Sequence, residues 1–358
     1  MPDLQGNQDT YNAVRKDTEI FKCKSCGGNL IYSPKTGQMS CAFCGSASDF
    51  NKDPNIIPID FFNEGNVGKP WEEATVFKCN NCGASEIISK YEIAKTCPFC
   101  GTSNIVLTNE LPGIAPNAVL PFKLSIDDAK ERFKKWMSHS FFAPRKLKKL
   151  VKDENVSGVY SPCFSFFTNT KSTYYGVLGK YYSNGKTSTL RTFKISGNYD
   201  MSFSDILIEC GPQLTQKEID KIKPFPTNQA YKYDLKYLAG FLATSYSKSV
   251  QASFEDAKKI MQNMLKRKIL SQYSYDVVES LNINTIYNDI RFNYLLVPVY
   301  ICNYQYGGKT YNFYVNGTNG KIWGKKPVSG WKIFGTIAIA AAIVAGGAVL
   351  ILKLMGKI

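Results

Sequence analysis

The stretch Cys23-Lys-Ser-Cys26-Gly27, followed by Cys41-Ala-Phe-Cys44-Gly45, decides how the N-terminal part of this chain folds. The same arrangement returns 56 residues later as Cys79-Asn-Asn-Cys82-Gly83 and Cys97-Pro-Phe-Cys100-Gly101. Each quartet places fourteen residues between two pairs of cysteines, and a glycine follows every pair. One module has therefore been used twice.

The spacing within each module is typical of a metal site built from thiolates. Two residues between paired cysteines form a tight turn that directs both sulfurs at one tetrahedral ion, and the following glycine supplies the positive φ of that turn. About thirty residues bury too little apolar surface to fold alone, so a bound metal must stabilise each module by on the order of 10 kcal/mol. The sequence predicts two small β zinc ribbons, each with one structural Zn2+, whose ligands are Cys23, Cys26, Cys41, Cys44, Cys79, Cys82, Cys97 and Cys100.

No catalytic residues are predicted. A catalytic zinc site keeps one coordination position open for water, usually with histidine or carboxylate ligands, whereas four cysteines close the site. The single histidine, His139, lies outside both quartets in a Ser-His-Ser stretch expected at the surface. The run Gly307-Gly-Lys-Thr310 lacks the earlier glycine of a phosphate-binding loop and is predicted to be a hairpin turn. A third possibility is an enzyme whose active site is assembled from residues far apart in the sequence.

The net charge of +15 is distributed unevenly. Residues 1–110 carry 10 basic and 13 acidic side chains, whereas residues 111–358 carry 34 and 16. The acidic ribbons are poor partners for phosphates, so nucleic acid is not expected to bind them. Basic side chains of the second half are predicted to contact an anionic membrane surface, and each would add about 1 kcal/mol of attraction. The alternative is that they form solvated helix faces. The residues are Lys134, Lys135, Lys148, Lys149, Lys266, Arg267, Lys268, Lys325 and Lys326.

The C-terminal region contains 20 consecutive residues without a charge, Ile333–Leu352. As a helix this stretch covers about 30 Å, the thickness of the hydrocarbon core. We expect one C-terminal transmembrane helix that anchors a single-pass protein in the bacterial cell membrane, with the bulk of the chain cytoplasmic; a buried helix is the alternative. Three small residues of this stretch are spaced four apart, namely Ala338, Ala342 and Gly346. They are predicted to allow close packing of a partner helix or a second copy; the alternative is that they face lipid.

The reducing cytoplasm implied by zinc thiolates makes disulfides unexpected. The remaining cysteines are therefore predicted to be buried thiols, namely Cys163, Cys210 and Cys302.

The central region is predicted to be an α+β domain with an antiparallel sheet. Capping signatures open helices at Ser125 and at Ser253, each with an acidic residue three positions later. An aromatic, strand-like run with a proline follows each helix, and turns are expected at Asn184-Gly185, Gly307-Gly308 and Asn316-Gly317. This pattern indicates a duplicated helix-hairpin unit.

These predictions divide the chain into eight parts. They are a disordered lead-in at 1–19, zinc ribbon 1 at 20–50, a linker at 51–75, zinc ribbon 2 at 76–108, a linker at 109–120, the α+β domain at 121–330, the transmembrane helix at 331–352 and a short tail at 353–358.

Beyond the paired ribbons, three segments carry a resemblance. They are the Leu120-Pro-Phe start, the Tyr237-Leu-Ala-Gly-Phe segment, and the run from Pro298 through Lys309-Thr-Tyr to Asn316-Gly-Thr-Asn-Gly-Lys-Ile-Trp-Gly. With these segments the chain resembles the YdjG-like membrane-anchored double zinc-ribbon proteins of Firmicutes, sometimes labelled primosomal helicase-like or TFIIB-type. The tryptophans expected after the two strand prolines are replaced by Cys163 and by Tyr300 or nearby aromatic residues.

The resemblance implies a non-enzymatic membrane platform. Together with a second membrane protein, such a platform would hold flotillin-like (SPFH) and phage-shock (PspA-like) proteins at the envelope under stress. The leading expectation is accordingly a tail-anchored adaptor whose ribbons face the cytoplasm. The alternative is a membrane-tethered nucleic-acid-binding protein that uses the basic helices.

Overall fold

The computed structural model describes residues 21–62, 74–81, 85–89, 97, 99–100, 102, 105–108, 114–138, 155–183, 185, 187–327 and 330–354. Three residues singled out above lie outside these ranges along with Cys82, namely His139, Lys148 and Lys149. The predicted lead-in at 1–19 lies outside them as well.

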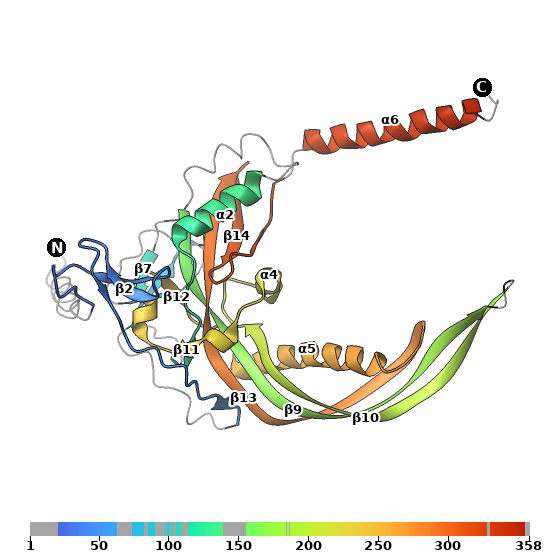
Figure 1. Ribbon diagram of the computed structural model, residues 1–358, viewed down its shortest axis with the longest axis horizontal. Coiled ribbons are helices and arrows are strands. Elements are labelled where there is room, and N and C mark those ends of the chain that lie inside the picture. Colours follow the sequence, from blue (N-terminus) through green and yellow to red (C-terminus); the bar gives the residue numbers. More distant parts are fainter. Residues whose placement is uncertain are drawn as a thin grey trace, which may run out of the picture.

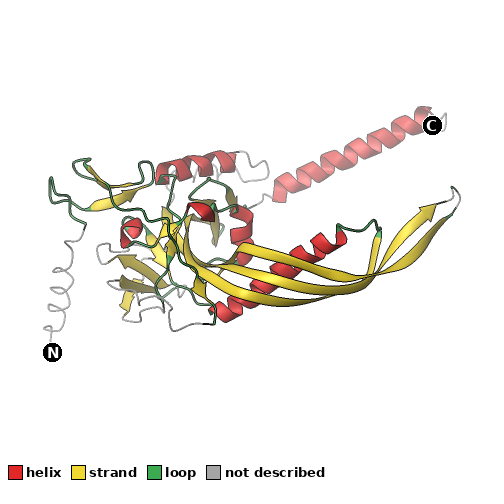
Figure 2. Ribbon diagram, turned by 60° about the horizontal axis from the view of Figure 1, so that its bottom comes forward, coloured by secondary structure: helices red, strands yellow, loops and turns green. Residues whose placement is uncertain are grey.

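Three long antiparallel strands form the centre of the protein (Figure 1). The middle strand, β9 (Asn155–Ser183), pairs with β10 (Ser188–Glu209) on one side and with β13 (Val277–Tyr306) on the other. Together they extend as a curved arm, and helix α5 (Val250–Leu270) lies on its concave side (Figures 1 and 2). The buried stripe of α5, with Phe254, Met261 and Leu265, repeats every three or four residues, as expected for a helix packed on a sheet.

Short strands extend the central three into a mostly antiparallel 12-stranded sheet. They include β4 (Ile59–Asp60), β8 (Ala118–Val119), β11 (Tyr231–Lys232), β12 (Leu242–Thr244), β14 (Lys309–Asn316) and β15 (Ile322–Gly324). Two of the pairings between described strands are parallel, β12 with β9 and β13 with β8. Because β4 and β8 come from the segments predicted as linkers, those segments also contribute to the sheet.

A helix followed by a hairpin occurs twice. Helix α2 (Ile126–Ser138) precedes β9 and β10, whereas α5 precedes β13 and β14. The expected turns are present: Gly185 has φ +87° between β9 and β10, and Gly307 and Gly308 have φ +59° and +73° between β13 and β14.

The predicted start of the first helix is confirmed, whereas the predicted start of the second is wrong. The Ser125 hydroxyl accepts from the N–H of Asp128, whose carboxylate in turn accepts from the Ser125 N–H at 2.9 Å. The second helix, α5, has its N-cap at Ser249, four residues before the predicted cap, because the Ser249 hydroxyl accepts from the N–H of Ala252 at 3.2 Å. Ser253 is buried inside α5.

The Asn316-Gly-Thr-Asn-Gly motif is a turn fastened to a short helix, α4 (Gln216–Ile222). The buried Asn316 amide donates to the carbonyls of Ile222 and Pro224, both at 3.0 Å, and its oxygen accepts from the N–H of Thr318 at 2.9 Å. This satisfied buried amide gives the motif a structural role.

The predicted transmembrane helix requires a correction. Residues Gly330–Leu354 form helix α6, which projects from the body (Figure 1). Among the described residues, no helix has both the length and the apolar character needed to cross a membrane.

This finding corrects several predictions together. The fold class of two zinc ribbons, an α+β domain and one transmembrane helix is wrong in its last part. The single-pass, tail-anchored location in the bacterial cell membrane is overturned with it. Ala338, Ala342 and Gly346 are exposed on α6, and the reason for expecting them to pack in a membrane no longer applies.

Candidate metal centres

The first ribbon is a separate three-stranded sheet of β1 (Leu30–Ser33), β2 (Gln38–Cys41) and β3 (Ala47–Ser48). Its cysteines come from two matching turns. The N–H of Gly27 donates to the carbonyl of Cys23 at 2.8 Å, and the N–H of Gly45 donates to that of Cys41 at 3.1 Å. Both glycines have positive φ, +72° and +71°, as the cysteine spacing predicts.

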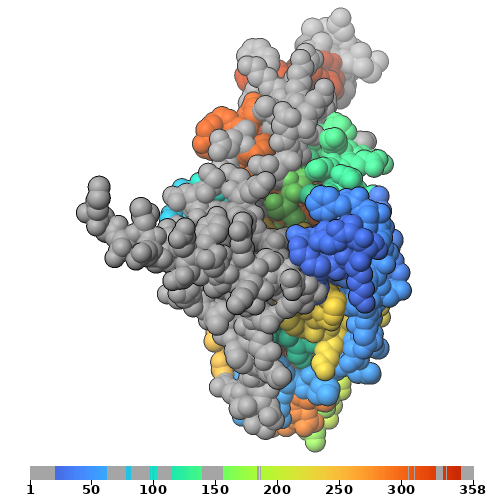
Figure 3. Space-filling view, turned by 90° about the vertical axis from the view of Figure 1, so that its left-hand side faces the viewer, coloured from blue at the N-terminus to red at the C-terminus, as the bar shows by residue number. Residues whose placement is uncertain are grey.

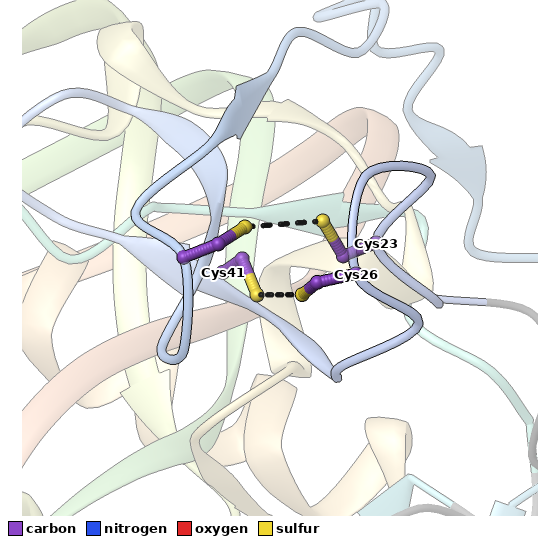
Figure 4. Close-up of side chains that lie close together, drawn as sticks. Cys23, Cys26 and Cys41 are labelled. Atoms are coloured by element: carbon purple, nitrogen blue, oxygen red, sulfur yellow. Dashed lines mark hydrogen bonds between the residues drawn. The ribbon is translucent and has the colours of Figure 1, made fainter.

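The two turns direct four sulfurs toward one point (Figure 4). Cys23 Sγ lies 3.5 Å from Cys44 Sγ, Cys26 Sγ lies 3.5 Å from Cys41 Sγ, and all four sulfurs are within 4.8 Å of one another. A tetrahedral ion with metal–sulfur bonds of about 2.3 Å requires sulfurs roughly 3.8 Å apart. The quartet therefore has the right donors at the right spacing to hold a metal ion.

Ser46 is a neighbour of the sulfurs that the sequence analysis did not identify. Its hydroxyl lies 2.9 Å from Cys23 Sγ and 3.1 Å from Cys44 Sγ. This hydroxyl, helped by backbone N–H groups, lowers the pKa of Cys23 to about 5, and it also lowers the pKa of Cys44. For Cys26 the N–H of Gly28 acts in the same direction, but the neighbouring sulfurs outweigh it and raise the pKa to about 12. A metal that binds all four as thiolates must therefore displace a proton from Cys26.

The second ribbon uses β5 (Ala74–Cys79), β6 (Ser85–Ser89) and β7 (Ile105–Thr108). Cys79, Cys97 and Cys100 meet there, with 3.7 Å between the sulfurs of Cys79 and Cys100. The N–H of Cys97 donates to the carbonyl of Thr102 at 2.7 Å, which repeats the bond from Cys41 to Ser46 at 2.9 Å. The described part of this cluster also has the composition of a metal site.

The two ribbons have different surroundings. Ribbon 2 is part of the main sheet, because β6 pairs with β12, and Cys79 and Cys97 are buried in an apolar cluster that also contains Val159. Ribbon 1 lies at the surface (blue in Figure 3) and is attached through Tyr32. The Tyr32 N–H donates to the carbonyl of Ala239 at 2.9 Å. Cys26 and Cys44 are exposed, so a metal in ribbon 1 is reachable from solvent.

The two ribbons place the phenylalanine at one equivalent position of the repeat in opposite environments. Phe43 in Cys41-Ala-Phe-Cys44 and Phe99 in Cys97-Pro-Phe-Cys100 are 56 residues apart, like the cysteines. Phe99 is 5% exposed within the apolar cluster, whereas Phe43 is 81% exposed. The same side chain that joins ribbon 2 to the sheet is thus presented to solvent by ribbon 1.

The predicted basic surface divides into two groups. Lys134 and Lys135 are exposed on α2, whereas Lys266, Arg267 and Lys268 are exposed near the end of α5, and these helices lie well apart (Figures 1 and 2). Lys325 is exposed near α2, but Lys326 lies over the Trp136 ring, 3.6 Å from its centroid. Burial lowers the pKa of Lys326. The described residues of this set therefore do not form one continuous face.

The other cysteines are buried thiols, as predicted. One of them belongs to a polar group that the sequence analysis missed, around Glu209 at the end of β10. This carboxylate, 6% exposed, accepts from the Ser161 hydroxyl at 3.1 Å, from the Cys163 thiol at 3.3 Å and from the N–H of Gly211 at 3.0 Å. Burial raises the pKa of Glu209 to about 7. The partners come from distant segments, so no local motif indicates them.

Comparison with known proteins gives one informative match. The chain is 27% identical over 341 residues to YdjG, an uncharacterized protein of Bacillus subtilis (strain 168), and the match covers 94% of this chain and 96% of that protein. No family model matches the chain, and no solved structure matches it. The similarity thus extends along nearly the whole length of both chains.

Proposed function

We propose that this protein is a non-enzymatic adaptor, in which two structural zinc ions hold the ribbons and ribbon 1 presents Phe43 to a protein partner. The observation that carries the proposal is the contrast between Phe43 and Phe99 at one position of the repeat. Exposed aromatic side chains on a rigid support are characteristic of protein interfaces.

Zinc is the metal that best matches the donors. Four thiolates in tetrahedral arrangement favour zinc over magnesium or calcium, which prefer oxygen ligands. Four protein ligands leave no open coordination position, so the metal would hold the two turns in place without catalysing a reaction. In ribbon 1 the second turn carries Phe43 between two ligands, so the metal would also fix the base of this aromatic side chain.

The geometry around Gly28 supports a fixed position for the Phe43 ring. A Cβ added to Gly28 would lie 2.6 Å from Phe43 Cδ2, and 3.2 Å and 3.3 Å from the sulfurs of Cys41 and Cys26. The ring therefore lies directly against the backbone of the first turn while most of it stays exposed. A partner that covers the ring loses little conformational entropy in ordering it.

The resemblance names the partners to test first, an SPFH protein and a PspA-like protein of the same organism. The zinc-loaded full chain is immobilised, and binding of each purified partner is measured by biolayer interferometry. We expect binding to one of them, and we expect Phe43→Ala to weaken it by at least about tenfold, as for a central interface aromatic. Chelation of the metal should weaken it as well.

Tyr175→Ala is the matched control, because Tyr175 is also an exposed aromatic side chain but lies on β9 in the arm. It should leave binding unchanged. Equal loss in the two variants, or full binding by Phe43→Ala, would contradict the role of ribbon 1. Absence of binding to both partners would contradict the partner class.

A further inference from the structure

A pocket lies between the bulge of β10, the segment around residues 225–230 and strand β13. Its volume is about 460 Å³, within the range of roughly 300–1,000 Å³ usual for small-molecule sites. Its apolar walls include Phe167, Phe225 and Leu295, and Ile56 and Ala118 contribute from the N-terminal half. Among the described residues that line it, the only charged one is Asp205.

Asp205 is held in an unusual conformation. The pairing of β10 with β9 shifts register between Phe203 and Ile206, so Ser204 and Asp205 form a bulge. Asp205 has φ +62°, a conformation that costs a non-glycine residue energy and that clusters at functional sites. The bulge places its side chain among the residues that line the pocket.

Two hydroxyl groups orient the Asp205 carboxylate. Ser165 Oγ donates to Oδ1 at 2.7 Å, and Thr227 Oγ1 donates to Oδ2. A carboxylate has about four acceptor positions, so two neutral donors leave capacity for a ligand. None of the ion pairs formed by the described lysines and arginines involves Asp205. Among the residues that the structure describes, the negative charge is therefore oriented but has no ionic partner.

We propose that this pocket binds an alkylammonium group, with the cation on Asp205 and the attached apolar part against Phe225 and Leu295. A partly buried carboxylate without an ionic partner favours a cation, because the surrounding low dielectric strengthens the attraction. The apolar walls favour an organic cation over a hydrated metal ion. The ammonium group comes either from a free amine or from a lysine side chain of a peptide.

The test uses phenethylamine and Nα-acetyl-lysine methylamide as probes of the two sources, and 2-phenylethanol as the uncharged counterpart of the first. Binding to the full zinc-loaded chain is followed by NMR, through the amide signals of Ser204, Thr227 and Asn228. We expect saturable shifts of these signals with at least one ammonium probe and about tenfold weaker binding of the alcohol.

Asp205→Asn removes the charge and keeps the backbone, because asparagine tolerates positive φ. Its amide oxygen accepts from one of the two hydroxyls, and its NH2 group can donate to the oxygen of the other. It should weaken the ammonium probe about tenfold, to the level of the alcohol. Asp289→Asn is the matched control, since Asp289 also has positive φ, +50°, but is not among the residues that line the pocket. It should bind as the unchanged protein does.

Three results would overturn the proposal. They are the absence of shifts with both ammonium probes, equal binding of 2-phenylethanol and phenethylamine, and full binding by Asp205→Asn. The comparison of probes on the unchanged protein decides the question even where the variant does not fold.

Discussion

Replacing Phe99 by alanine should destabilise the protein far more than replacing Phe43 by alanine, although the two residues occupy the same position of the repeat. Phe99 is 5% exposed, and truncation of a buried phenylalanine to alanine costs about 3–5 kcal/mol. Phe43 is 81% exposed and so buries roughly a fifth of its surface, which scales the cost to below about 1 kcal/mol. The expected difference is about 2–4 kcal/mol.

Urea unfolding with excess zinc measures both values, followed by circular dichroism and by tryptophan fluorescence. Zinc in excess keeps the metal sites loaded, and metal content is determined for each variant, so that loss of metal is not mistaken for loss of packing. Equal destabilisation by the two variants, or a larger effect of Phe43→Ala, would refute the reasoning. Either result would mean that Phe43 is covered within the protein and is not available to a partner.

Three further predictions concern the metal sites and the buried carboxylate. Gly28→Ala should lower the affinity of ribbon 1 for zinc, because the added Cβ meets the Phe43 ring at 2.6 Å. Competition with a chromophoric chelator measures the loss of affinity. Gly347→Ala on α6, whose added Cβ meets nothing within 4 Å, should show no loss. A chelator should remove the metal in two phases, the faster one from ribbon 1, where Cys26 is exposed. Release in a single phase would contradict the idea that the cysteines of ribbon 2 are better protected by burial than those of ribbon 1. Burial raises the pKa of Glu209 to about 7, so the folded state binds its proton more tightly than the unfolded state does. Stability should therefore fall by about 3 kcal/mol as pH rises from about 4.5 to 7. Glu209→Gln should remove this part of the pH dependence, and an unchanged profile would exclude Glu209 as its source.

Local patterns predicted local structure well. The cysteine spacing and the glycines after each pair predict the two turns of ribbon 1, because a C-x2-C turn involves few residues and one backbone conformation. The cap at Ser125 and the turn at Gly307-Gly308 were predicted for the same reason. The start of α5 was missed because Ser249 lacks the acidic residue three positions later that marks Ser125.

Features that depend on how distant segments pack together were predicted poorly from the sequence. Twenty uncharged residues gave the expectation of a transmembrane helix, whereas no helix among the residues that the structure describes meets the requirements. The sequence predicted basic residues on two helices in contact with a membrane surface, but it gave no indication that Lys326 covers the ring of Trp136. Charge and hydropathy along a chain do not say which side chains share a face.

The amino-acid order alone was sufficient to reveal a duplicated four-cysteine module and its turns, because metal ligation constrains residues that are close in sequence. The fold was required to reveal that Phe99 is buried while Phe43 is exposed, that Glu209 meets Cys163, and that Asp205 faces a pocket. Each of these depends on segments far apart in the chain. Their meeting is set by strand pairing and packing across the whole sheet, which leaves no signature in any short stretch of residues.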